Sequence, residues 1–141
     1  MRRINLIGWL VLAGCSSSTA PGGWQRVVGR MEPELSSIQA VIVPAEAVAD
    51  APFEIVVHTV GSSSCTRAAG ALSSVAGNTA LITPYDLVAP ENTPCTRDLR
   101  AFPHSVTVVL KSAGEGLIRV QARGSGGRPI TLDLSIPVRV P

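Results

Sequence analysis

The C-terminal segment, residues 130–140, is the part of the sequence that most constrains the fold. Every second residue is apolar, and the residues between them are polar, charged or proline. The apolar positions are Ile130, Leu132, Leu134, Ile136, Val138 and Val140. Alternation sustained over this length is typical of a β-strand with one buried face. Pro137 cannot donate to a β-ladder, which predicts that this strand lies at a sheet edge or bulges there.

Shorter runs of the same kind follow one another through the rest of the chain. They cover residues 24–31, 38–43, 53–60, 71–75, 79–83, 105–110 and 117–123. The pair Gly77-Asn78 predicts a type II′ hairpin turn between two of these runs, and Pro84-Tyr85-Asp86 is expected to end that hairpin. One short helical turn is expected from Thr93-Pro94 through Arg100, with Cys95 inside it.

Seven or eight short strands, separated by turns every ten or so residues, predict an all-β fold made of two antiparallel sheets. Alternating apolar and polar faces suit a β-sandwich in which each sheet has one solvated side. At the level of strand pattern, residues 24–141 resemble the immunoglobulin-like domains of bacterial envelope lipoproteins. The Cys…Trp…Cys arrangement of antibody domains is missing, because no Trp lies between Cys65 and Cys95. The resemblance implies a single immunoglobulin-like sandwich.

The first fifteen residues have a different character. Arg2 and Arg3 precede an apolar run over residues 4–12, which is too short to span a bilayer and has the length of a signal-peptide core. Leu12-Ala13-Gly14-Cys15 resembles the lipobox of bacterial lipoprotein signal peptides. The resemblance implies cleavage before Cys15 and lipidation of the Cys15 thiol. The alternatives are an ordinary secretory signal and a buried N-terminal strand.

This reading divides the chain into a lipoprotein signal peptide over residues 1–14, a lipidated cysteine and flexible tether over residues 15–23, and a β-sandwich domain over residues 24–141. Lipidation implies a protein anchored to a membrane through Cys15. Ser16 is similar to the residue that follows the cysteine in outer-membrane lipoproteins. We therefore expect a cell-envelope location, on the periplasmic side of the outer membrane.

Cys65 and Cys95 remain after the predicted cleavage. An even pair in an exported chain predicts a disulfide, and closing a loop of about 31 residues would stabilise the fold by roughly 3 to 4.7 kcal/mol. The alternative, a reactive or metal-binding thiol pair, would favour close spacing such as C-x-x-C. This spacing is absent.

The number and distribution of charged residues predict that the protein has no nucleic-acid partner. The chain holds 12 Lys and Arg residues against 10 Asp and Glu residues. Arg2 and Arg3 leave with the predicted signal, so the mature chain is balanced. Its cations are scattered rather than clustered, whereas a nucleic-acid interface needs a basic patch.

The chemistry-bearing residues do not form a recognisable catalytic or metal motif. His58 and His104 are the only histidines, and no G-x-S-x-G motif places a serine for a catalytic triad. His104 is interpreted as a loop residue at a strand entrance. We expect no enzyme activity, no cofactor and no transition-metal site. Asp86, Glu91 and Asp98 are alternatively calcium ligands, although no D-x-D-x-D-G series supports them.

The leading hypothesis is a non-catalytic, lipid-anchored envelope domain that engages proteins or the cell wall through loops or a sheet edge. Its rival is a small-ligand or enzyme-accessory lipoprotein. The rival predicts a pocket lined by Tyr85, Asp86, Arg97 and Arg100 near the Cys65–Cys95 bridge. A third reading is sugar binding, for which Tyr85 is the aromatic residue expected to be exposed.

Overall fold

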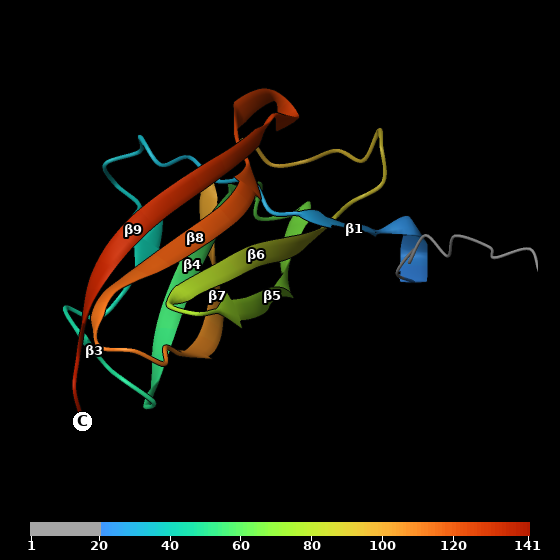
Figure 1. Ribbon diagram of the computed structural model, residues 1–141. Coiled ribbons are helices and arrows are strands. Elements are labelled where there is room, and N and C mark those ends of the chain that lie inside the picture. Colours follow the sequence, from blue (N-terminus) through green and yellow to red (C-terminus); the bar gives the residue numbers. More distant parts are fainter. Residues whose placement is uncertain (1–20) are drawn as a thin grey trace, which may run out of the picture.

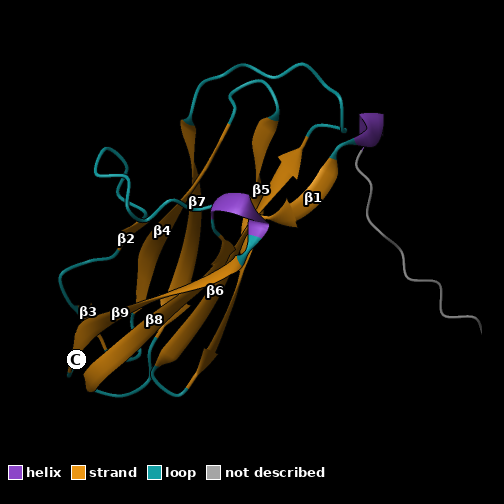
Figure 2. Cartoon of the chain, turned by 90° about the horizontal axis from the view of Figure 1, so that it is seen from above, coloured by secondary structure: helices purple, strands orange, loops and turns teal. Residues whose placement is uncertain are grey.

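The computed structural model describes residues 21–141. The predicted signal peptide, Cys15 and most of the predicted tether lie outside the described residues. The described part folds as an all-β sandwich, as predicted, with two layers of strands facing each other (Figures 1 and 2). The strands are β1 (Gln25–Val28), β2 (Val41–Ile42), β3 (Ala47–Val48), β4 (Pro52–Gly61), β5 (Thr66–Ala76), β6 (Thr79–Val88), β7 (Arg100–Val109), β8 (Gly114–Arg123) and β9 (Pro129–Arg139).

The larger sheet has the order β1-β6-β8-β9-β3, with β5 also paired to β6, and the smaller sheet has the order β2-β4-β7. Most neighbours are antiparallel, whereas β6 with β8 and β3 with β9 are parallel. Strand β6 is the branching point. Strand β5 pairs with one edge of β6 along most of the length of β6. The other edge of β6 pairs with two strands in succession: with β8 over Thr79–Ile82, and with β1 over Tyr85–Val88.

The core lies between the sheets and follows the two-residue period of the strands. Alternate residues of β4, β6, β7 and β8 are buried. In β9 the expected inward positions are buried at Ile136 and Val138 and half-buried from Ile130 to Leu134, and Val140 lies past the strand end and is exposed. Among the largest fully buried side chains are Met31, Ile55, Ile82, Leu110, Ile118 and Ile136.

The β5–β6 hairpin is longer than predicted. Gly77 has a φ of 59° and Asn78 lies outside the positive-φ region, which is the pattern of the expected type II′ turn. The prediction that the hairpin ends at Pro84 was wrong, because β6 continues to Val88. Pro84 is tolerated because its backbone faces the other edge of β6, in the gap between the pairing with β8, which ends at Ile82, and the pairing with β1, which begins at Tyr85.

The predicted helical turn over residues 93–100 was also wrong. These residues form an exposed loop that leads into β7 at Arg100. A helical turn would need backbone N–H groups bonded four residues back. The N–H of Thr96 instead donates to Ser64 Oγ at 2.9 Å, across the chain. Contacts distant in sequence thus hold this loop extended.

Pro137 lies at a sheet edge, the first of the two alternatives predicted for it. The β8–β9 ladder runs through the pair Glu115–Pro137 without a register shift. On its other side, β9 meets only β3, at Val138 and Arg139. The missing donor of Pro137 therefore lies where the described structure offers little pairing.

Candidate functional site

An open groove of about 710 Å³ lies on the outer face of the larger sheet. It forms where β6 exchanges β8 for β1 as its neighbour. Its apolar lining includes Val27, Val28, Pro129 and Ile130, and its polar lining includes Thr83, Tyr85, Gln121, Arg123 and Thr131. No Asp, Glu or His is among these residues. The groove thus combines an apolar surface with a few polar groups and one cation.

Two arginine–aromatic stacks lie in or next to strands β1, β5 and β6, and one of them contains Tyr85 of the groove. The Arg26 guanidinium carbon lies 3.7 Å from the centre of the Tyr85 ring, and that of Arg67 lies 4.3 Å from the centre of the Trp24 ring. Both distances suit cation–π attraction, worth about 0.5–1 kcal/mol each at exposed sites. Tyr85 is therefore half-buried rather than exposed as expected. A guanidinium also occupies one face of its ring, the surface on which a sugar would stack.

The structure does not bring together the four residues predicted to line a ligand pocket. Tyr85 and Asp86 are neighbours in β6 and point to opposite faces of the sheet. Asp86 is buried between the sheets. Arg97 is exposed in the loop before β7, and Arg100 begins β7 opposite Gly61. Of the four, only Tyr85 lines the groove.

Asp86 instead belongs to a buried polar cluster that joins the two sheets. His104 Nε2 of β7 lies 3.0 Å from Asp86 Oδ1 of β6. The Thr59 hydroxyl of β4 donates to Asp86 Oδ1 at 3.0 Å and lies 2.9 Å from His104 Nε2. His104 is buried in a strand, so the interpretation of it as a loop residue was wrong.

Hydrogen bonds satisfy both ring nitrogens of His104. His104 Nδ1 lies 3.0 Å from the carbonyl oxygen of Gly70, which can only accept, so Nδ1 carries a proton. The Asp86 carboxyl and the Thr59 hydroxyl both face Nε2, so the polar atoms of the three side chains find partners within the cluster and its surroundings. Gly29 closes over the cluster, since a Cβ there would lie 2.3 Å from Thr59 Cγ2.

The cluster contains the residue types of a catalytic triad in a different arrangement. In a catalytic triad the acid holds one imidazole nitrogen and the nucleophile meets the other. Here Asp86 and Thr59 both meet Nε2 of His104, and Nδ1 faces a backbone carbonyl. All three side chains are buried. The geometry is that of a structural ion pair within the core.

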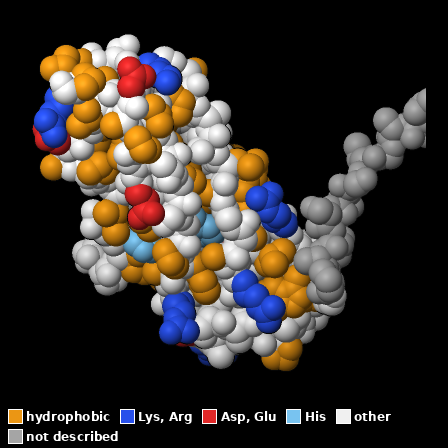
Figure 3. Space-filling view, turned by 90° about the horizontal axis from the view of Figure 1, so that it is seen from below, with side chains coloured by type: hydrophobic (Ala, Val, Ile, Leu, Met, Phe, Trp, Pro, Cys, Tyr) orange, Lys and Arg blue, Asp and Glu red, His pale blue; other side chains and the backbone are white. Residues whose placement is uncertain are grey.

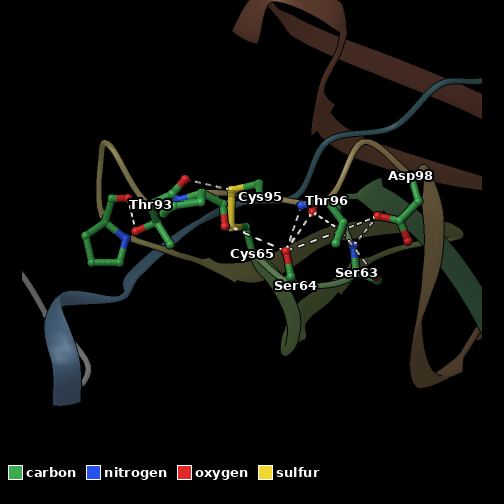
Figure 4. The surroundings of a disulfide bond; sticks show 10 residues. Ser63, Ser64, Cys65, Thr93, Cys95, Thr96 and Asp98 are labelled. Atoms are coloured by element: carbon green, nitrogen blue, oxygen red, sulfur yellow. Dashed lines mark hydrogen bonds between the residues drawn. A yellow bond between two sulfur atoms is a disulfide. The ribbon is translucent and has the colours of Figure 1, made fainter.

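The predicted disulfide between Cys65 and Cys95 is confirmed, with their Cα atoms 5.6 Å apart (Figure 4). It ties the turn before β5 to the exposed loop before β7. Polar contacts reinforce the link: Ser62 Oγ lies 2.9 Å from Thr96 Oγ1, and the Ser63 N–H donates to Asp98 Oδ1 at 3.1 Å. Hydrogen bonds from Ser63 and Thr96 lower the pKa of Asp98 to about 2.

Asp98 thus stabilises this loop rather than joining Asp86 and Glu91 around a cation. Asp86 is buried against His104, and Glu91 is exposed. Within residues 21–141, no three His, Cys, Asp or Glu side chains are placed to hold a metal ion.

Charges on the face shown in Figure 3 are scattered, and its Lys and Arg side chains lie apart from one another. Over the described residues, no helix has the length and apolarity needed to cross a membrane. Comparisons with protein-family models, with curated proteins and with solved structures find no match to this chain.

Proposed function

We propose that this protein is a lipid-anchored envelope protein whose β-sandwich is a non-catalytic binding domain for an extended segment of a partner protein. The observation that carries the proposal is the open groove on the outer face of the larger sheet. Small-molecule sites are usually enclosed enough to bury most of their ligand. An open groove with an apolar lining suits an extended chain better.

The charge of the groove indicates which segments it accepts. Arg123 lines it, Arg26 stands on Tyr85 at its side, and no carboxylate is among its lining residues. Arg123 is held in place because its Nε donates to the carbonyl of Val28. A neutral or acidic segment would meet no repulsion here, whereas a basic one would. The partner is therefore expected to present an extended stretch with apolar side chains and no excess of Lys or Arg.

The anchor is tested by the intact mass of the protein extracted from membranes, measured before and after reduction and thiol alkylation. We expect a chain beginning at Cys15 with acyl chains attached, and thiol labelling only after reduction. The C15A variant should leave the membrane fraction. An unacylated mass, or an unchanged membrane fraction for C15A, would contradict the lipid anchor.

The groove is tested by site-specific photocrosslinking in the intact cell envelope. A photoreactive residue at Thr83, inside the groove, is expected to capture one defined partner. Thr131→Trp, which fills the groove from an exposed position, should lower that yield about tenfold, a loss of about 1.4 kcal/mol. Thr107→Trp is the matched control, since Thr107 is exposed on β7 of the smaller sheet. Equal yields from both variants would contradict binding in the groove.

A further inference from the structure

The second half of β5, from Ala71 to Ala76, is an open sheet edge. It pairs with β6 on one side, and no other strand of the described chain pairs with it. Every residue from Leu72 to Ala76 is exposed, and Leu72 and Val75 are 59% and 39% exposed. Free backbone groups and apolar side chains therefore face solvent together.

This edge lacks the features with which proteins usually prevent sheet edges from associating. Such features are charged side chains, prolines, bulges or a covering loop. No charged residue occurs between Arg67 and Asp86. A bulge separates Ala68 from Ala71, and the Gly70 carbonyl there accepts from His104 of β7. The bulge thus hinders pairing with another strand only along the first half of β5.

The hairpin geometry indicates which backbone groups are available. A two-residue turn is closed by a hydrogen-bonded pair, here Ala76 with Thr79. Because bonded and non-bonded pairs alternate along an antiparallel ladder, Ala71, Ser73 and Val75 direct their N–H and C=O groups toward the open side. Three residues with short or branched side chains thus offer donors and acceptors to another strand.

We propose that this edge pairs antiparallel with the same edge of a second copy of the chain, across a two-fold axis perpendicular to the sheet. A two-fold contact places a surface against itself, so it must be self-complementary. An uncharged strand meets this condition because no like charges face each other. The axis preserves the faces of the sheet, so Leu72 of each copy lies on the same outer face near the junction. The formal net charge of +2 adds little overall repulsion.

The open edge of β9 shows why the second copy belongs on β5. The part of that strand before its pairing with β3 carries Asp133, and Pro137 interrupts its donors. Paired with itself, it would leave hydrogen bonds unmade at Pro137. The six residues of the β5 edge form a smaller contact than a standard interface of about 1,600 Å². The dimer is therefore expected to be weak and dependent on concentration, and it leaves the groove of each copy free.

Cysteine crosslinking of the full-length protein, purified in the form in which it occurs, tests this proposal. Ser73→Cys should give a disulfide-linked dimer on mild oxidation. The matched control is Ser135→Cys, an exposed serine on the edge strand β9, and it should give none. Sedimentation of the unmodified protein should show a monomer–dimer equilibrium, and Ser73→Lys should weaken the association about tenfold.

A strictly monomeric unmodified protein would overturn the proposal without reference to any variant. Equal crosslinking from Ser73→Cys and Ser135→Cys would also overturn it, because collisions would then explain both. Capture of a different protein by Ser73→Cys when the crosslinking is repeated in the intact cell envelope, with no homodimer, would assign the edge to another partner and likewise overturn it.

Discussion

Replacement of Asp86 by alanine is expected to lower the free energy of unfolding by about 3–5 kcal/mol, because it removes one member of a buried ion pair. His104 would lose the carboxyl group that lies 3.0 Å from its Nε2, and Thr59 would lose its acceptor. Neither group could reach water, since both are buried. Urea unfolding followed by circular dichroism measures the change. The loss is comparable with a large part of the 5–15 kcal/mol that stabilises a typical domain.

The matched control is Asp133→Ala, which removes the carboxylate of the exposed Arg119–Asp133 pair in the same sheet. Both members of that pair stay accessible to water, so its loss should be far smaller. Replacing Asp86 and His104 together by leucine should recover much of the stability lost in D86A, because no charge is then left unpaired. If D86A lost no more stability than D133A, the buried pair would not hold the sheets together as described.

Alternation of residue types predicted most of the fold, and its limits are physical. The strands β4, β8 and β9 lie close to where the apolar period of two placed them, because each has one face against the core, whereas β7 begins at Arg100, before the predicted start at residue 105. The boundaries at Pro84 and around Thr96 were wrong because both depend on contacts distant in sequence: the change of neighbour from β8 to β1, and a bond to Ser64. The residues of one strand do not indicate which other strands pair with it.

The same error at Pro84 displaced the predicted site. Because the predicted strand ended before Asp86, its alternation of inward and outward residues was not extended to Asp86. Extending the inward positions of β6 from Ile82 by the strand period gives Pro84 and then Asp86. The same count from Val57 gives Thr59, and counting back from Val106 gives His104. The sequence thus carried the signal that these three polar residues face the core.

The groove and the open edge differ in how far the sequence could reveal them. The groove exists because β6 changes neighbours from a parallel to an antiparallel strand, and nothing in the residues of β6 alone specifies this change. The uncharged stretch between Arg67 and Asp86 is visible in the printed sequence. Only the sheet order shows that half of it is an unpaired edge rather than a central strand.

Replacing Cys65 and Cys95 together by serine is the second change expected to have a large effect. The crosslink joins residues 30 apart in the sequence, and its loss should lower the free energy of unfolding by about 3 to 4.7 kcal/mol because the unfolded chain regains the entropy of that loop. The double variant avoids leaving one reactive thiol behind. Urea unfolding measures the change, and the dependence on urea should keep its slope if the native contacts survive.

Reduction of the natural protein provides the control for this prediction. It should produce the same loss of stability, whereas the double serine variant should not respond to the reductant. The contacts of Thr96 with Ser64 and of Ser63 with Asp98 remain available without the bridge, so the folded loop is expected to keep its course. An unchanged midpoint in both experiments would mean that these hydrogen bonds, rather than the disulfide, fix the loop before β7 against the turn before β5.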